Sequence, residues 1–165
     1  TLLEWEMADE IGDASLWRTM DVETIQREYS PSSAIGGDFL PFVESYQTES
    51  DKARANCRNQ KTLRYGTAPA NTIDIASPNI ENSSPLIVYI HGGYWQHHSK
   101  NDSFFGADWF VEHGIAYAAV DYTLAPNASL TEIVQIIGRA TRDAEGAGVG
   151  GRPRAAQGRH AGLCC

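Results

Sequence analysis

The chain has 165 residues, of which 42% are hydrophobic and four are tryptophan, a size and composition that suit one domain with a substantial core. Its formal net charge of -8 argues against a nucleic-acid backbone or an anionic membrane surface as a partner. The charge is unevenly distributed, because residues 138–165 carry five arginines against one aspartate and one glutamate, whereas residues 1–137 are strongly acidic.

The longest apolar runs are strand-sized and fall short of the roughly 18 residues that a membrane span needs, so no membrane association is expected. No charged and then apolar leader is present, which predicts no secretory signal, although a chain that starts at Thr1 leaves room for an upstream piece. The three cysteines, Cys57, Cys164 and Cys165, make no disulfide framework. We therefore expect a cytoplasmic protein.

The first 60 residues are predicted to form helical segments. Asp21 is a suitable N-cap for a helix over residues 22–29, and the turn-rich stretch 30–38 ends it. Pro41 suits the first turn of a second helix, which continues to about Cys57. The apolar residues at helical spacing in this second helix are Phe42, Val43, Tyr46, Ala53 and Cys57.

After residue 60 the hydrophobic period changes to that of strands. Short alternating runs at 62–65 and 72–76 predict an antiparallel pair at a sheet edge, with Asp74 facing solvent. Uniformly apolar runs at 86–90 and 115–120 predict strands that are covered on both faces.

Two helices are predicted around the second of these buried strands. The first covers residues 103–113, with Asp102 or Ser103 as its cap. The second begins with a capping box formed by Ser129 and Glu132. Its apolar face is predicted to consist of Leu130, Ile133, Val134 and Ile137. This βαβ order predicts an α/β fold whose sheet is mostly parallel, with helices on both faces.

The sequence IHGGYWQ, residues 90–96, ends the first buried strand. Ligands of an open α/β sheet meet the carboxyl ends of its strands. Gly92 and Gly93 let the backbone turn sharply and leave N–H groups in the crevice, where such donors stabilise a developing oxyanion by about 3–4 kcal/mol each. A tight turn that needs glycine for steric reasons alone is the alternative, and the residues by themselves do not separate the two.

HGGYWQ, the SKND that follows it, and DYTLAP after the next strand resemble the α/β-hydrolase family. The pattern is most similar to the kynurenine formamidase (arylformamidase) branch, whose members carry an H-G-G-x-W motif. REYSPSS at 27–33 and LRYG at 63–66 also resemble that branch, whereas the Y-x-L-A-P element at 122–126 is shared with related esterases. The similarity covers roughly residues 21–137.

The resemblance implies that the backbone N–H groups of Gly92, Gly93 and Tyr94 form an oxyanion hole. It implies that His91 shapes this loop rather than acting as a base, and that His91 and Trp95 belong to the substrate-binding region. Trp95 would wall an acyl or aryl pocket, and core packing is an equally open interpretation of it.

The same resemblance implies a hydrolase that converts N-formyl-L-kynurenine to L-kynurenine and formate in tryptophan catabolism, through attack of a serine on the formyl carbon and without a cofactor. A carboxylesterase or lipase-like enzyme is the alternative within the fold. A non-catalytic remnant or a small-molecule-binding protein is the alternative of another class.

The catalytic triad of the family is missing from these 165 residues. A serine in G-x-S-x-G, then an acid and a histidine, should follow the oxyanion loop, but no G-x-S-x-G occurs and the last serine is the helix cap Ser129. Residues 158–162, GRHAG, have the glycine spacing with His160 at the centre, yet the arginine-bearing stretch before them does not fit a buried strand. We expect this chain to be catalytically incomplete.

Residues 138–165 are predicted to be an atypical Gly/Ala/Arg-rich, disordered tail without a strand or a packed helix. A truncation or a shifted reading frame beginning near Gly138 would explain the bias, because these residues have GC-rich codons; a natural disordered tail is the alternative. The predicted organisation is therefore N-terminal helical segments at 1–60, the N-terminal half of an α/β-hydrolase core at 61–137, and the tail.

No metal site is predicted, because His97 and His98 are adjacent and no H-E-x-x-H occurs. The expected partner is a small-molecule substrate, an aryl formamide or ester, with no nucleic acid and no membrane; a homodimer stays open. Asp121 ends a buried strand and is expected to hydrogen-bond local backbone rather than to catalyse.

Overall fold

The structure is a computed structural model that describes residues 18–78 and 84–149. The chain divides into two compact units between Pro41 and Phe42. Helix α2 (Leu40–Asn56) therefore belongs almost entirely to the second unit, which contains the sheet. The first unit contains α1 (Val22–Glu28) and the 3-10 helix η2 (Pro31–Ile35). Asp21 caps α1 as predicted, since its carboxylate accepts the Thr24 N–H at 2.7 Å.

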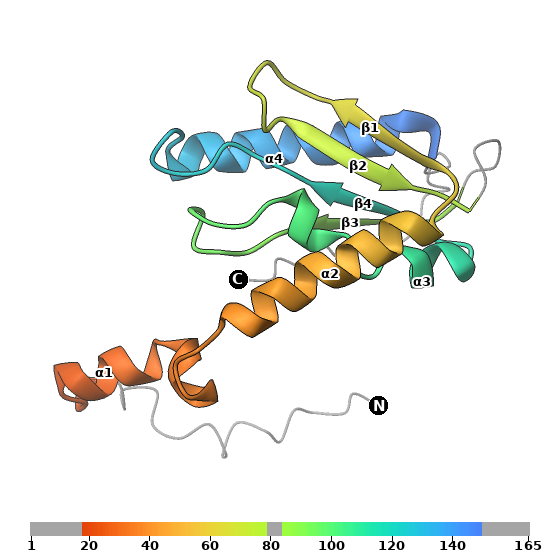
Figure 1. Ribbon diagram of the computed structural model, residues 1–165. Helices are drawn as coiled ribbons and strands as arrows, with labels where there is room; N and C mark the ends of the chain where they lie inside the picture. Colours follow the sequence, from red (N-terminus) through yellow and green to blue (C-terminus); the bar gives the residue numbers. More distant parts are fainter. Residues whose placement is uncertain (1–17, 79–83, 150–165) are drawn as a thin grey trace, which may run out of the picture. The chain divides into compact units, whose positions relative to one another are not determined.

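The second unit is built on a four-stranded sheet in the order β1-β2-β4-β3 (Figure 1). Its strands are β1 (Gln60–Arg64), β2 (Thr72–Ala76), β3 (Leu86–Ile90) and β4 (Ala116–Val120). The predicted α/β class is confirmed, but the described sheet is mixed, because β2 pairs antiparallel with both β1 and β4 and only β3 and β4 run parallel.

The burial of each strand depends on its position in the sheet. All residues of β2 and β4 are buried, as expected of strands with a neighbour on each side. Strand β3 lies at the edge of the described sheet and is only partly buried up to Tyr89, so the expectation of full burial is met by β4 and not by β3. The expectation that Asp74 faces solvent is wrong: β2 is an inner strand and Asp74 is 8% exposed.

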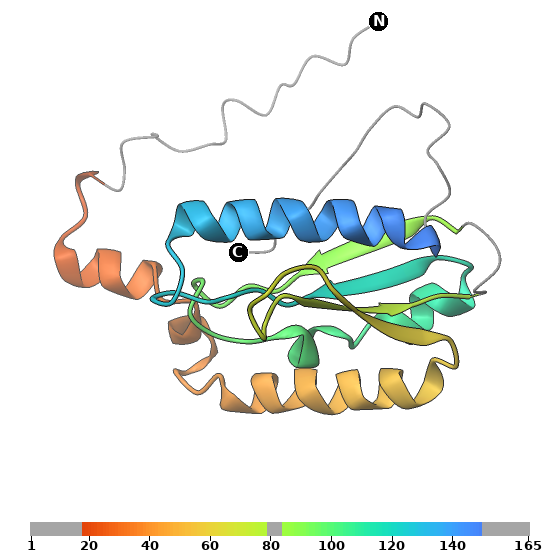
Figure 2. The same cartoon turned by 90° about the horizontal axis from the view of Figure 1, so that it is seen from above.

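Helices cover both faces of the sheet (Figure 2). One face packs against α4 (Leu130–Ala144), in a core that includes Ile73, Ile75 and Ile133. The other packs against α2 (Leu40–Asn56) and α3 (Ala107–Glu112), in a core that includes Phe104 and Tyr117. The two apolar cores lie on opposite faces, as βαβ connections require.

The helix predicted over 103–113 is divided. A 3-10 helix η3 (Lys100–Ser103) begins at a capping box formed by Ser99 and Asp102, and α3 begins only after Gly106. The predicted cap at Asp102 or Ser103 is therefore wrong: Ser99 caps η3 by accepting the Asn101 N–H at 3.1 Å, and Gly106 is the N-cap of α3.

Helix α4 begins at the predicted capping box of Ser129 and Glu132, and its buried side is only partly the predicted one. Ile133 is fully buried and Ile137 packs against the core, as expected. Leu130 and Val134 are 57% and 65% exposed, whereas Ala140 and Ala144 are fully buried. The predicted apolar face did not include these two alanines. The helix therefore runs past Gly138 as a packed element and is followed by a π-helical turn, η4 (Glu145–Val149).

Candidate active site

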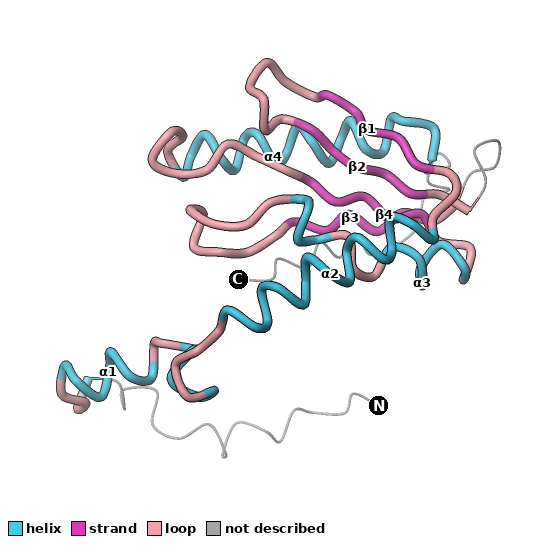
Figure 3. The backbone as a smooth tube through the Cα atoms, in the orientation of Figure 1, coloured by secondary structure: helices cyan, strands magenta, loops and turns pink. Residues whose placement is uncertain are grey.

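The HGG sequence follows β3 directly and forms a tight loop at the end of the sheet where the carboxyl ends of β3 and β4 lie (Figure 3). The carbonyl oxygen of Gly93 accepts hydrogen bonds from the N–H groups of Gln96 and His97, both at 3.0 Å. Gly93 has a φ of +104°, and a Cβ placed on it would stand 2.5 Å from the His97 carbonyl oxygen. Glycine is therefore sterically required at this position.

Three further residues of the loop have a positive φ: Tyr94 at 53°, Trp95 at 62° and His98 at 70°. Residues other than glycine in this region cost of the order of 1–3 kcal/mol each, and such strain is concentrated at functional sites. The loop thus holds an unfavourable backbone conformation that a simple connection between β3 and η3 would not need.

The loop also presents unused donors. None of the hydrogen bonds found among residues 18–78 and 84–149 uses the backbone N–H of Gly92, Gly93 or Tyr94. Gly92 and Gly93 are partly exposed, and Tyr94 is 75% exposed. Two or three N–H groups are thereby available beside the carboxyl ends of the two parallel strands.

His91 lies inside this loop with a 3% exposed residue surface. Its Nδ1 is 2.9 Å from the carbonyl oxygen of Gly92, and because a carbonyl only accepts, Nδ1 carries the hydrogen. The ring stacks on Tyr122 at a centroid distance of 4.3 Å, and the Tyr122 hydroxyl donates to the His91 carbonyl at 2.9 Å. Within the described residues Nε2 has no hydrogen-bond partner; Asp121 Oδ1 stands 3.7 Å away.

Asp121 itself serves local backbone, as predicted. Its Oδ1 accepts the Tyr122 N–H at 3.1 Å, and its carbonyl oxygen accepts the Tyr65 hydroxyl. Burial raises the pKa of Tyr65 and of Tyr122 to about 12, so both hydroxyls remain protonated donors at neutral pH. The segment after β4 is thereby tied to both the HGG loop and the loop that precedes β2.

Trp95 is partly buried and packs against the core on the α4 side. Its ring centre lies 6.3 Å from that of Tyr122, and its carbonyl oxygen accepts the Ala125 N–H at 2.8 Å. These contacts match the core-packing interpretation of Trp95. The role of Trp95 as the wall of a substrate pocket stays a prediction.

Asp74 lies at the centre of a charged cluster that was not predicted from the sequence. The cluster includes Lys100, which begins η3 at the end of the loop that starts with HGG. Asp74 accepts Arg54 Nη1 at 2.6 Å, Lys100 Nζ at 2.6 Å and Thr62 Oγ1 at 2.7 Å. Arg54 also donates to the Lys100 carbonyl at 3.0 Å and lies 4.3 Å above the Phe104 ring. A carboxylate in the middle of an apolar strand was the available signal, because such a group needs partners.

Three further predictions concern His160, metal sites and membrane-spanning helices. His160 and its flanking glycines are outside the described residues. In the part of the chain that the structure describes, no three His, Cys, Asp or Glu side chains gather in a way that could hold a metal ion. No helix in that part is long and apolar enough to span a membrane.

The BD-FAE family profile matches residues 73–142, from β2 to the last turns of α4. Kynurenine formamidases from Danio rerio and Salmo salar are each 29% identical to the chain, over 130 and 132 residues. The chain is similar to the kynurenine formamidases and has an α/β-hydrolase fold. The match covers 75% and 76% of this chain but only 44% and 45% of the two relatives, so the chain spans less than half of their length.

Solved structures agree with this fold. The crystal structure of a proposed thioesterase from Silicibacter sp. TM1040 superposes with a TM-score of 0.63 and 26% identity, and covers 70% of this chain and 44% of that one. The carboxylesterase EstE1, from a metagenomic library, gives a TM-score of 0.51 at 15% identity, over 70% of this chain and 41% of its own. The second similarity shows the fold alone.

Proposed function

We propose that the protein to which these residues belong hydrolyses an aryl formamide, N-formyl-L-kynurenine, to L-kynurenine and formate. The observation that carries the proposal is the strained loop after β3, with its free Gly92 and Gly93 N–H groups, in a chain whose relatives are kynurenine formamidases. A small-molecule substrate and a cytoplasmic location belong to the same proposal.

In the proposed reaction a serine oxygen attacks the formyl carbon, and the formyl oxygen becomes an oxyanion that the loop N–H groups stabilise. Breaking the C–N bond releases the aryl amine, which takes up a proton and leaves a formyl ester on the serine. Water then hydrolyses this ester to formate. Since these 165 residues contain no G-x-S-x-G, the proposal assigns the chain the oxyanion half of the site and no turnover of its own.

In this proposal His91 orients the peptide unit that carries the Gly93 N–H group. The Gly92 carbonyl and the Gly93 N–H belong to one trans peptide unit, in which the two groups point in opposite directions. The hydrogen bond from His91 Nδ1 draws the Gly92 carbonyl toward the buried ring, so the Gly93 N–H points away from it. His91 is thus a positioning residue rather than a base.

Assays with two substrates test the proposal. A full-length relative that carries the H-G-G-x-W loop should hydrolyse N-formyl-L-kynurenine with a higher kcat/KM than p-nitrophenyl acetate, and the reverse order would favour a carboxylesterase, to which the Y-x-L-A-P element also fits. The 165-residue chain should turn over neither substrate. Turnover by this chain that is lost on replacing one of its residues would contradict the proposed incompleteness.

The altered composition near the end is proposed to reflect a shifted reading frame that starts later than Gly138. The family profile continues to residue 142 and the buried face of α4 to Ala144, which supports a normal sequence up to that point. Translating the source DNA in three frames beyond residue 142 should reveal a G-x-S-x-G. If none of the frames contains one, the frameshift hypothesis is wrong.

A further inference from the structure

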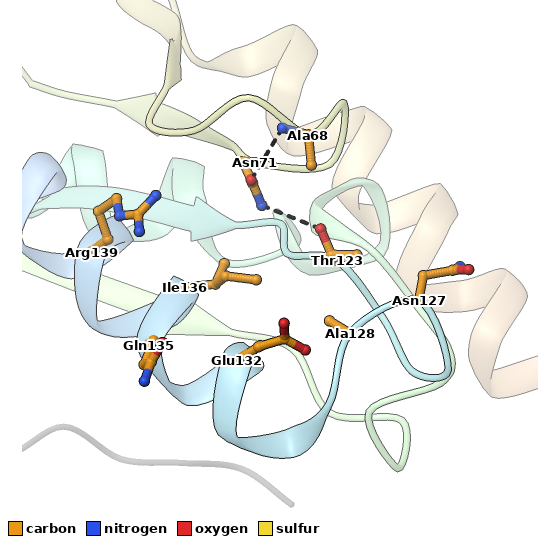
Figure 4. A pocket seen from close by; sticks show the side chains of 9 residues that line it. All are labelled: Ala68, Asn71, Thr123, Asn127, Ala128, Glu132, Gln135, Ile136 and Arg139. Atoms are coloured by element: carbon orange, nitrogen blue, oxygen red, sulfur yellow. Dashed lines mark hydrogen bonds between the residues drawn. The ribbon is translucent and has the colours of Figure 1, made fainter.

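A cavity of about 330 Å³, open to solvent, lies beside α4, and none of the predicted site residues lines it (Figure 4). Its charged lining residues Glu132 and Arg139 are exposed. It is built by the loop before β2 and by the segment after β4, which leads directly into α4, the third contributor. The nine lining residues are Ala68, Asn71, Thr123, Asn127, Ala128, Glu132, Gln135, Ile136 and Arg139. This volume is at the lower end of the roughly 300–1,000 Å³ of small-molecule sites.

Arg139 provides a cation at one end of the cavity. Its guanidinium takes part in no hydrogen bond or ion pair found in residues 18–78 and 84–149, so all of its donors are available to a ligand. A planar guanidinium with paired N–H groups matches the two oxygens of a carboxylate.

Glu132 provides an anion at the other end. Its Oε2 accepts both the N–H and the hydroxyl of Ser129 at 2.7 Å, while Oε1 has no such partner among the described residues. These hydrogen bonds, the one with the Ser129 backbone first, lower the pKa of Glu132, so the side chain is a carboxylate at neutral pH. Glu132 and Arg139 are seven positions apart on one helix, which corresponds to about 10 Å along its axis.

The surface between the two charges is partly apolar and includes the Thr123 hydroxyl as a neutral donor. Ile136 and the methyl groups of Ala68 and Ala128 form the apolar part. Asn71 accepts the Ala68 N–H at 3.3 Å and donates to Thr123 Oγ1 at 3.4 Å, the two dashed bonds of Figure 4. Because Thr123 Oγ1 already accepts there, its own hydrogen is left to donate to a ligand.

We propose that this cavity binds a small organic zwitterion, with its carboxylate on Arg139, its ammonium on Glu132 and an apolar body over Ile136. Allowing about 2–3 Å for each charged contact, the two ligand charges are separated by roughly 4–6 Å across a span of about 10 Å. An α-amino acid group alone is too short to satisfy both ends, whereas an amino group and a carboxylate on opposite sides of a six-membered ring have a suitable separation.

Titration of the uniformly ¹⁵N-labelled 165-residue chain with 4-(aminomethyl)benzoate tests the proposal. The largest amide shifts are expected at Thr123, Glu132, Ile136 and Arg139, with a dissociation constant in the low millimolar range. Arg139→Gln should weaken binding of this probe by about tenfold, the loss of one charged contact. The matched control is Arg58→Gln, which replaces an exposed arginine outside the cavity and should leave the affinity unchanged.

Two half-probes separate the ends of the cavity. Benzoate binding should be weakened by Arg139→Gln and not by Glu132→Gln, and benzylamine binding should show the opposite pattern. Gln at position 132 keeps an oxygen that can accept from Ser129, so α4 retains its cap, and an unchanged melting temperature checks this. Absence of binding by all three probes, shifts outside the cavity, or equal affinities of the wild type and Arg139→Gln would overturn the proposal.

Discussion

Replacing Gly93 by alanine tests whether the loop after β3 needs glycine as the structure indicates. Alanine at a φ of +104° costs about 1–2 kcal/mol from the left-handed backbone alone. Its Cβ would also stand 2.5 Å from the oxygen and 2.9 Å from the carbon of the His97 carbonyl group, which are backbone atoms held by the turn that Gly93 itself closes. We expect the two effects together to lower the free energy of unfolding by about 3 kcal/mol or more.

Gly114→Ala is the matched control, because Gly114 has a φ of +78° and an added Cβ would meet no atom within 4 Å. This variant should lose only the backbone contribution, about 1–2 kcal/mol. Urea unfolding followed by circular dichroism gives both free energies, and amide shifts of residues 91–98 report the loop. A Gly93→Ala variant that loses no more stability than Gly114→Ala and keeps the wild-type loop shifts would refute the steric argument.

Three further outcomes are expected. Asp74→Asn should lower the free energy of unfolding by about 3 kcal/mol, because it leaves two partly buried cations without their carboxylate, whereas Glu49→Gln in an exposed pair should cost less than about 1 kcal/mol. Burial alone would raise the pKa of Asp74, but the hydrogen bond from Lys100 and further contacts outweigh it and hold the pKa below 3.8. The stabilisation is therefore present above that pH and lost as the pH falls below it. Urea unfolding between pH 7 and pH 2 should show a larger loss of stability in the wild type than in Asp74→Asn, in which Glu132 still contributes. Ile133→Ala should cost about 2–5 kcal/mol and Val134→Ala less than about 0.5 kcal/mol, since Ile133 is 0% and Val134 is 65% exposed; equal losses would contradict the assigned face of α4.

Local signals predicted most elements of the fold. The Asp21 cap, the capping box at Ser129 and the alternating pair at 62–65 and 72–76 all depend on residues a few positions apart, and each was found where expected. The position of β2 in the sheet depends instead on its pairing with β4, more than forty residues later. Periodicity within a strand carries no information on that neighbour, which is why Asp74 was expected in solvent.

In the candidate site, too, only the features that depend on neighbouring residues could be predicted. A pair of glycines at the end of an apolar strand was enough to predict the loop of residues 91–95, because the backbone requirement is local. The stacking of His91 on Tyr122 joins segments 31 residues apart, and the cavity of Figure 4 joins three segments. Such contacts arise from tertiary packing, so no spacing in a single sequence indicates them.

The strand order also affects the chain while it is being synthesised. Strands β2 and β3 follow one another in sequence, yet β4 lies between them in the sheet. About 30 residues separate the end of β3 from the end of β4, so at 5–20 residues per second β4 is completed roughly 2–6 s after β3. During that interval the apolar edges of β2 and β3 have no partner, and a nascent chain released before residue 120 exposes both to aggregation. Translation speed across residues 91–120 therefore influences how much protein folds.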